Sequence, residues 1–279
     1  MMKIAGVQMD VSLARVEQNL AKMLAFLAET RRAGAEFTIF PECALTGYCF
    51  ENADEARPHA QPVPGPAVER FASACRELGG FALFGLLEAD GPRLFNAAAL
   101  VGPAGTVAAY RKVHLPFLGA DMFTADGDRP FAVQEVAGVR VGINICYDAA
   151  FPEASRVLAL AGADLIALPT NWPAGADCMP EHAINTRAME NGVYYAAVDR
   201  VGTERGFQFI GKSRICGPRG ETLAASDGAE ETVLYAEIDP AKARDKRVER
   251  APGLVSLDRL ADRRPEMYGP VVDPVTDVQ

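Results

Sequence analysis

The chain has 279 residues, of which 49% are hydrophobic and 23% are charged, and its formal net charge at pH 7 is -9. This is ordinary globular composition, and the acidic balance disfavours a nucleic-acid-binding protein, which would usually present a basic face. No apolar run approaches the roughly 18 residues that a membrane-spanning helix needs, and the N-terminal residues lack a signal-peptide pattern.

Strands and helices alternate from the start of the chain. Apolar residues at helical spacing predict a helix over residues 13–27, and Pro66 suits the first turn of a second helix. Further helices are predicted near residues 153–161 and 181–191. The predicted strands, of which the last two are hairpin-like, cover residues 2–9, 37–40, 81–87, 94–101, 106–110, 131–136, 139–146, 163–168, 194–198, 212–216 and 232–238.

This mixture of helical crossovers and hairpins predicts the fold class. We expect an α/β protein in which two mixed β-sheets pack face to face with helices outside, although periodicity alone does not exclude one doubly wound sheet. The chain shows no internal repeat and no low-complexity linker. We expect a single domain over residues 1–245 and an extended C-terminal segment, rich in Pro, Asp and Arg, over residues 246–279.

The cysteines indicate the compartment. None of the six cysteines belongs to a C-x-x-C pair, and the chain is not a small disulfide-rich scaffold. We therefore expect reduced thiols, a cytoplasmic location and no structural zinc.

Three reactive side chains follow the ends of apolar strands. They are Glu42, Lys112 and Cys146. In open α/β sheets, sites are built at the carboxyl ends of strands. If the three meet, the carboxylate can take the thiol proton and return it to a leaving amine. The ammonium would lower the thiol pKa and stabilise a developing oxyanion. Taken singly, each residue also has an ordinary structural explanation, such as a buried cysteine or a solvated lysine.

The segments around these residues strengthen the prediction. The sequence contains Phe-Pro-Glu-Cys-Ala-Leu-Thr-Gly-Tyr at 40–48, Tyr-Arg-Lys-Val-His-Leu at 110–115 and Ile-Cys-Tyr-Asp-x-x-Phe-Pro-Glu at 145–153. In this order, and with further matching segments at 158–166, 169–173, 187–191 and 209–220, the chain resembles the nitrilase superfamily of carbon–nitrogen hydrolases over about nine-tenths of its length.

The resemblance implies a role for each matched position. Glu42 matches the general base of the family, Lys112 its catalytic lysine and Cys146 its nucleophile, and the backbone N–H of Tyr147 matches the second oxyanion donor. The family fold is a four-layer αββα sandwich. Its members commonly form dimers, so we expect a homodimer or higher homo-oligomer, with the C-terminal segment in subunit contacts. The resemblance implies no metal and no organic cofactor.

One part of the family pattern is absent. Many members carry a second glutamate between the lysine and the cysteine, which supports the lysine. Residues 114–128 contain no glutamate, and Asp121 is the candidate replacement because it lies just ahead of the Phe-x-x-x-Gly stretch. The alternative is an ordinary loop aspartate.

Two other site types are disfavoured. Residues 206–213 match the phosphate-loop pattern G-x-x-x-x-G-K-S, but the segment after them reads as a strand and a turn, and it cannot begin the helix that such a loop needs. A Cys–His enzyme could use only His59, His114 or His182, and it would leave Glu42 and Lys112 unexplained. We expect His114 to have a supporting structural role.

We therefore predict a hydrolase that cleaves a non-peptide carbon–nitrogen bond of a small amide through a Cys146 thioester. Tyr147-Asp148 after the nucleophile favours the amidase and carbamoylase branches, and Tyr48, Asn171 and Trp172 are the candidate substrate-binding residues, with core packing the alternative for Trp172. An N-carbamoyl amine amidohydrolase with the same triad is the nearest alternative. An acyltransferase and a non-catalytic interaction protein are alternatives from other classes. The lack of long hydrophobic segments disfavours the first, and the intact Glu–Lys–Cys set disfavours the second.

Overall fold

The computed structural model describes residues 1–251 and 253–273 of the chain. Its body contains two six-stranded mixed sheets. The first sheet has the order β14 (Thr232–Ile238), β1 (Met2–Gln8), β2 (Phe37–Ile39), β3 (Phe81–Asp90), β4 (Arg93–Gly102) and β5 (Gly105–Arg111). The second has the order β13 (Thr222–Ala225), β12 (Arg214–Cys216), β9 (Tyr194–Asp199), β8 (Leu165–Thr170), β7 (Val139–Ile143) and β6 (Val133–Val136).

The two sheets share one plan. Each has three parallel strands in the middle, β1–β2–β3 in the first and β7–β8–β9 in the second, and its outer strands are antiparallel. The parallel strands are connected through helices, as parallel pairing requires, whereas β3–β4–β5 and β6–β7 are hairpins. The carboxyl ends of β2 and β5 consequently face the same way, because β5 is separated from the parallel set by one antiparallel strand.

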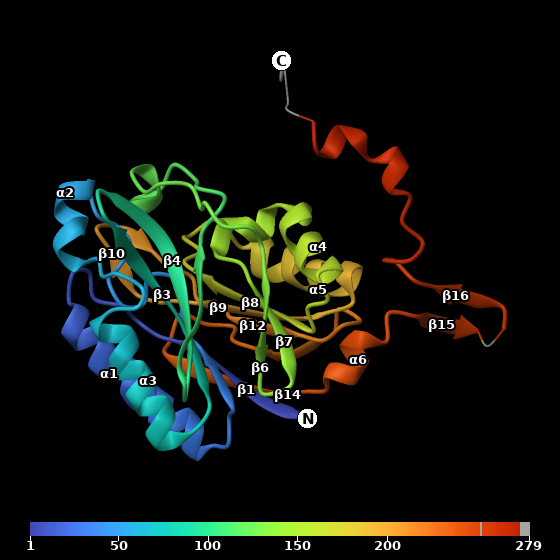
Figure 1. Ribbon diagram of the computed structural model, residues 1–279, viewed down its shortest axis with the longest axis horizontal. Coiled ribbons are helices and arrows are strands. Elements are labelled where there is room, and N and C mark those ends of the chain that lie inside the picture. Colours follow the sequence, from blue (N-terminus) through green and yellow to red (C-terminus); the bar gives the residue numbers. More distant parts are fainter. Residues whose placement is uncertain (252, 274–279) are drawn as a thin grey trace.

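Helices cover the outer face of each sheet. α1 (Val16–Arg32) and α3 (Pro66–Leu78) lie on one flank of the strands, and α4 (Pro152–Leu160) and α5 (Ile184–Asn191) lie on the other (Figure 1). Pro66 occupies the first turn of α3, as the sequence predicted, and Gly79 ends that helix with a positive φ of 74°. Two further short helices are α2 (Ala53–Ala56) and α6 (Pro240–Arg244).

The layers are held together by three apolar clusters. The central one lies between the sheets and joins residues such as Ile4 and Leu83 of the first sheet to Val141 and Leu165 of the second. One outer cluster packs α1 and α3 on the first sheet, and the other packs α4 and α5 on the second. Since both faces of each sheet are covered, the central strands read as nearly continuous apolar runs. The predicted αββα sandwich is confirmed.

One expectation about the strands is wrong. The last two predicted strands do not pair with each other and lie in different sheets. β12 forms its hairpin with β13, which the sequence analysis missed, and β14 pairs with β1 across the length of the chain. The β13 segment is short and half exposed, so its apolar pattern is weak. The Gly-Lys-Ser segment is followed by the predicted strand, β12, and not by the helix that a phosphate loop needs.

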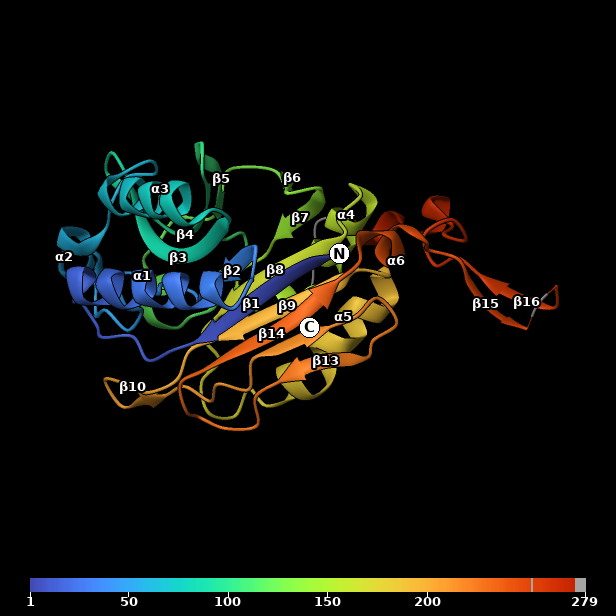
Figure 2. The ribbon, with the colours of Figure 1, turned by 90° about the horizontal axis from the view of Figure 1, so that it is seen from below.

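The C-terminal segment extends away from the body as an arm, which we define as residues 248–251 and 253–273 (Figure 2). It contains a small hairpin of β15 (Val248–Ala251) and β16 (Val255–Leu257), followed by two short 3₁₀ turns, so the expected extended form is interrupted there. A second small hairpin, β10 (Thr203–Glu204) with β11 (Phe207–Gln208), projects from the body. The rest of the predicted segment, residues 252 and 274–279, lies outside the described residues. None of the helices described is long and apolar enough to cross a membrane.

Candidate active site

Glu42, Lys112 and Cys146 converge at one end of the sandwich. Glu42 follows β2, Lys112 directly follows β5, and Cys146 comes three residues after β7. The first sheet therefore supplies the carboxylate and the ammonium, and the second supplies the thiol. The Nζ of Lys112 lies 2.7 Å from Oε1 of Glu42, and both charges act on the Cys146 thiol. The convergence that the strand ends predicted is present in the structure.

A glycine and a tight loop allow this approach. The segment with Glu42 crosses directly over β3 at Gly85, where an added Cβ would lie 2.6 Å from the Glu42 Cα. The loop that follows Lys112 returns to the same strand end at Gly127, where a Cβ would lie 2.3 Å from the Arg111 carbonyl oxygen. Any side chain at either position would push the site apart, because such distances are far below van der Waals contact.

Lys112 is a buried ammonium between two carboxylates. Its Nζ contacts Oε1 of Glu42 at 2.7 Å and Oδ2 of Asp121 at 2.6 Å, and all three side chains are fully buried. Burial by itself would lower the pKa of Lys112, but the two carboxylates outweigh it and hold the pKa well above its ordinary value. The two bonds leave one of the three ammonium hydrogens for another acceptor.

Asn96 and Tyr48 fix the two carboxylates. Nδ2 of Asn96, on β4, donates to Oε1 of Glu42 at 2.7 Å and to Oδ1 of Asp121 at 2.8 Å. The hydroxyl of Tyr48 lies 2.8 Å from Oδ2 of Asp121, and its ring lies 5.9 Å from the Lys112 ammonium. Both oxygens of Asp121 are thus occupied. Oε2 of Glu42, in contrast, is buried without a hydrogen-bond partner among the residues described.

Asn96 was not among the site residues predicted from the sequence. It is the one strongly polar side chain in the apolar run of residues 94–101, at a position that is fully buried in the sheet. A buried amide in such a run needs a hydrogen-bonding partner, and this was the signal that pointed to a polar site.

Cys146 occupies a sharp turn between β7 and a 3₁₀ turn over Cys146–Ala150. Its φ is +43°, in the left-handed region that costs a non-glycine residue about 1–3 kcal/mol. Cys146 as a residue is half-buried. The Thr170 hydroxyl and the Asn171 backbone N–H each lower the pKa of its thiol. The N–H of Tyr147 comes next, in the first turn, and it donates no backbone hydrogen bond within the described part of the chain.

The electrostatics of the thiol differ from the expectation. Burial raises the pKa of Cys146 far above its ordinary value, and the negative charge of Glu42 raises it further. Lys112 acts in the predicted direction and lowers this pKa, but it does not outweigh the other two effects. Burial also raises the pKa of Glu42, against the opposing charge of Lys112. At rest the site therefore holds a protonated thiol beside a carboxylate of increased basicity.

The three candidate substrate-binding residues lie around this centre. The side-chain amide of Asn171 is buried, and neither its Oδ1 nor its Nδ2 has a partner among the residues described. Trp172 is buried in the cluster between the second sheet and its helices, against which Cys146 also packs. Tyr48 touches Asp121 as described.

The histidines contact other groups. Nδ1 of His114 lies 2.7 Å from Oδ1 of Asp148, and its ring stacks on Phe151 with 3.8 Å between centroids. These contacts agree with a supporting role for His114, which stays a prediction. The ring of His59 stacks on Phe50, and His182 lies in a π-helical turn before α5. Among the described residues, the charges acting on Cys146 come from Glu42 and Lys112 and not from a histidine.

Comparison with known proteins gives consistent results. A family model for carbon–nitrogen hydrolases matches residues 3–248. The chain is 40% identical to a nitrilase of Pyrococcus abyssi over 271 residues, which are 96% of this chain and 99% of the relative. It is 29% identical to an omega-amidase of Bos taurus over 252 residues, 85% of this chain and 88% of the relative.

A solved structure is also similar. A variant of an amidase from Nesterenkonia sp. AN1 carries the acetamide moiety of fluoroacetamide added covalently at its active-site cysteine. It superposes with a TM-score of 0.79 and 26% identity over 96% of this chain and 95% of that chain.

The buried lysine gives a test of the charge arrangement. Lys112→Met removes the only positive charge between two buried carboxylates, so we expect the free energy of unfolding at neutral pH to fall by about 3 kcal/mol. Without Lys112 the pKa of Glu42 rises further, and the lost stability should partly return as the pH falls through that raised pKa. Urea unfolding at neutral and acid pH measures both effects.

Lys212 provides the matched control. It also bridges two carboxylates, Asp177 at 2.7 Å and Glu181 at 2.9 Å, but its side chain is 29% exposed. Lys212→Met should cost less than about 1 kcal/mol. Equal losses in the two variants would contradict the assignment of Lys112 as the buried charge that compensates two buried carboxylates.

Proposed function

The chain belongs to the carbon–nitrogen hydrolase family and is an amide hydrolase that acts through a cysteine intermediate, and on that basis we propose that Cys146, Glu42 and Lys112 are its nucleophile, general base and oxyanion-binding lysine. The observation that carries the assignment is the single unpartnered oxygen of the buried cluster, Oε2 of Glu42, beside a thiol on which its charge acts.

The two carboxylates around Lys112 have different roles. Each oxygen of Asp121 already accepts a hydrogen bond, Oδ1 from Asn96 and Oδ2 from Lys112, whereas Oε2 of Glu42 accepts none among the residues described. Glu42 keeps Oε2 free, and its raised pKa makes it a better base than an exposed glutamate. Asp121 therefore replaces the expected second glutamate as the group that orients Lys112.

The state of the thiol determines how the attack begins. Because the pKa of Cys146 is raised, the resting form is a thiol, and a stable thiolate–imidazolium type of pair does not form here. Proton transfer to Glu42 must accompany attack on the carbonyl carbon. This arrangement keeps the nucleophile unreactive until a substrate is in place.

The oxyanion is held by two donors. The remaining hydrogen of the Lys112 ammonium and the backbone N–H of Tyr147 are both available, and both lie beside Cys146 in the fold. In comparable sites, removing one oxyanion donor costs about 3 kcal/mol of transition-state stabilisation. Lys112 keeps its charge throughout because its pKa is well above its ordinary value.

The reaction follows from these roles. The sulfur of Cys146 bonds to the substrate carbonyl carbon while Glu42 takes the thiol proton. The tetrahedral adduct collapses, the C–N bond breaks, and ammonia or an amine leaves with the proton from Glu42. A water molecule then gives a proton to Glu42 and adds to the thioester. Release of the carboxylic acid regenerates the thiol, so that amide and water yield acid and amine.

The substrate proposed is a small primary amide. Among the residues described, the buried amide of Asn171 has a donor and an acceptor without partners, which suits hydrogen bonding to another amide. Trp172 and Tyr48 supply apolar surface. The similarity to an omega-amidase and to an amidase supports this choice. The relative named nitrilase makes nitriles the class to test beside amides.

The primary experiment is ammonia release from a panel of primary amides, N-carbamoyl amines and nitriles. We expect ammonia release from the amides. In Cys146→Ala the rate of release should fall at least a thousandfold, while the circular dichroism spectrum of the variant stays the same as that of the wild type. Cys178→Ala is the matched control because Cys178 is the exposed free cysteine, and it should retain wild-type turnover. Turnover that survives in Cys146→Ala would disprove the proposed nucleophile.

We also propose that the chain forms a homodimer and that the arm contacts the second copy. The arm makes no hydrogen bond or salt bridge to residues 1–246 within the part of the chain described, yet it exposes 87% of Leu254 and 83% of Val272. An ordered segment with large exposed apolar side chains is typical of a docking element. Val157 and Leu160 of α4, the helix that also supplies Arg156, are exposed as well.

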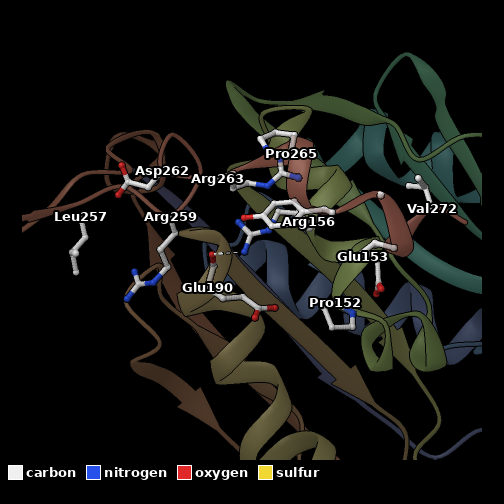
Figure 3. A pocket seen from close by; sticks show the side chains of 13 residues that line it. Pro152, Glu153, Arg156, Glu190, Leu257, Arg259, Asp262, Arg263, Pro265 and Val272 are labelled. Carbon is white, nitrogen blue, oxygen red and sulfur yellow. Dashed lines mark hydrogen bonds between the residues drawn. The ribbon is translucent and has the colours of Figure 1, made fainter.

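A cavity separates the arm from the body. It has a volume of about 820 Å³ and is lined by Arg156 of α4, Glu190 of α5 and arm residues that include Arg263 and Tyr268 (Figure 3). Nη1 of Arg156 is buried in this region without a partner among the residues described. Side chains of a second copy would fill the cavity and could satisfy that guanidinium.

Deleting the segment from residue 248 onward should convert a dimer into a monomer, measured by light scattering coupled to size-exclusion chromatography. Leu254→Asp should weaken the dimer in the same direction, because it would bury a charge in the contact. Leu78→Asp, an equally drastic change at an exposed apolar position on the opposite flank, should leave the dimer intact. A monomeric full-length chain, or a dimer without the arm, would refute this proposal.

We place the protein in a reducing compartment and propose the cytoplasm. All six cysteines are free thiols, and five of them take no part in the proposed chemistry. The nucleophile itself must stay reduced to act.

A further inference from the structure

The Asp148 carboxylate is a fully buried group that the mechanism above does not use. Its two oxygens make four polar contacts. Oδ2 accepts the Tyr110 hydroxyl at 2.7 Å and the Ile145 backbone N–H at 2.9 Å. Oδ1 accepts the His114 backbone N–H at 3.1 Å and contacts Nδ1 of the same residue at 2.7 Å. Burying a carboxylate is costly unless every oxygen is satisfied, so this arrangement calls for a functional explanation.

The four contacts come from the two segments that carry the reactive groups. Tyr110 and His114 lie two residues before and two residues after Lys112, at the end of β5 in the first sheet. Ile145 lies directly before Cys146, after β7 in the second sheet. Asp148 itself lies two residues after Cys146. One carboxylate thus connects the lysine segment of one sheet to the cysteine turn of the other.

Asp148 also closes the turn around Cys146. Its own backbone N–H donates to the Ile145 carbonyl oxygen at 2.9 Å, while its side chain accepts from the Ile145 N–H at 2.9 Å. The two bonds form a ring across Cys146, whose φ of +43° would otherwise relax. The same ring fixes the direction of the Tyr147 N–H, which lies inside it.

Aromatic rings shield this carboxylate from water. The His114 ring stacks on Phe151 at 3.8 Å and an interplanar angle of 11°, and Tyr147 meets Phe151 edge-on at 5.1 Å. Exclusion of water strengthens the four polar contacts of Asp148, because it lowers the local dielectric constant.

We propose that Asp148 is a positioning residue that sets the Cys146 thiol and the Tyr147 N–H relative to Lys112, so that one oxyanion can be bound by both donors. The inference rests on the proposed function, in which Cys146 is the nucleophile and these two groups bind the oxyanion. Asp148 touches no reacting atom. Its effect is on carbonyl addition, which needs the two donors at once, and not on the intrinsic reactivity of the thiol.

The test compares two reactions of the same thiol in Asp148→Asn. Amide hydrolysis requires the oxyanion donors, whereas alkylation of Cys146 by iodoacetamide forms no oxyanion. The variant keeps the shape of the side chain but presents an NH₂ group to two of the donors. We expect kcat to fall by about 10²-fold, with KM and the alkylation rate constant each changing by less than about tenfold, because small displacements of reacting groups have effects of this size.

Asp164→Asn is the matched control. Asp164 is an equally buried aspartate on the same sheet, bound by Arg140 and Arg244 at a distance from the site. This variant should lower the melting temperature without changing kcat. If Asp148→Asn does not fold, Tyr110→Phe and His114→Ala each remove one contact at the same carboxylate, and each should lower kcat by a smaller factor while alkylation persists.

The outcomes separate the proposals. Unchanged kcat in Asp148→Asn, or hydrolysis and alkylation that fall in parallel with the folded fraction, would overturn the positioning role. The proposed function would still stand if Cys146→Ala were inactive in the same assays. Activity in Cys146→Ala would instead refute the proposed function itself.

Discussion

The site depends on one buried interaction, the Lys112 ammonium held between the carboxylates of Glu42 and Asp121. The cluster carries an excess of one negative charge in a fully buried environment, and this excess explains the properties of its neighbours. Burial raises the pKa of the Cys146 thiol most, and the charge of Glu42 raises it further against the opposing charge of Lys112. In the proposed mechanism this couples formation of the nucleophile to proton transfer. Asn96 neutralises none of this charge but fixes its geometry, since one amide group donates to both carboxylates.

The fold supplies this arrangement from two independent sheets. The packing between them must therefore fix their relative position closely, so that the reactive groups meet. The central apolar cluster aligns the sheets, and Gly85 and Gly127 allow backbone to approach where any side chain would not fit. The remaining alignment is polar. Asp148 is the group that bonds to both the segment of Lys112 and the turn of Cys146, which makes it the natural point of control over their separation.

Much of this could be predicted from the sequence, and the exceptions have physical causes. The layered fold followed from apolar strands alternating with amphipathic helices. Glu42, Lys112 and Cys146 were selected by their places at strand ends together with the family motifs around them. The pairing of β14 with β1 could not be predicted, because it joins segments more than 200 residues apart and no local pattern encodes it. The net direction of the Cys146 pKa depends on burial, which a sequence does not give.

The contact between Asp121 and Lys112 is a second feature that the sequence could not decide. The sequence offered an aspartate where a longer side chain was expected, and spacing alone could not decide whether it reaches the lysine. The 3₁₀ turn over Gly119–Met122 brings it within 2.6 Å, and Tyr48 completes its hydrogen bonding. Asn96 was missed because a single polar residue in an apolar strand indicates that a partner is needed but not which residues supply it.

The central claim is that an acyl group is transferred from the amide to Cys146 before water takes it. It is tested most directly by adding hydroxylamine to the assay and measuring the ratio of hydroxamate to acid. The same acyl group should be supplied once as its primary amide and once as its ethyl ester. A shared thioester predicts one ratio for both substrates, because partition occurs after the leaving group has gone, and Cys146→Ala should form neither product. Ratios that differ with the leaving group would contradict the account, since water would then attack the substrate directly.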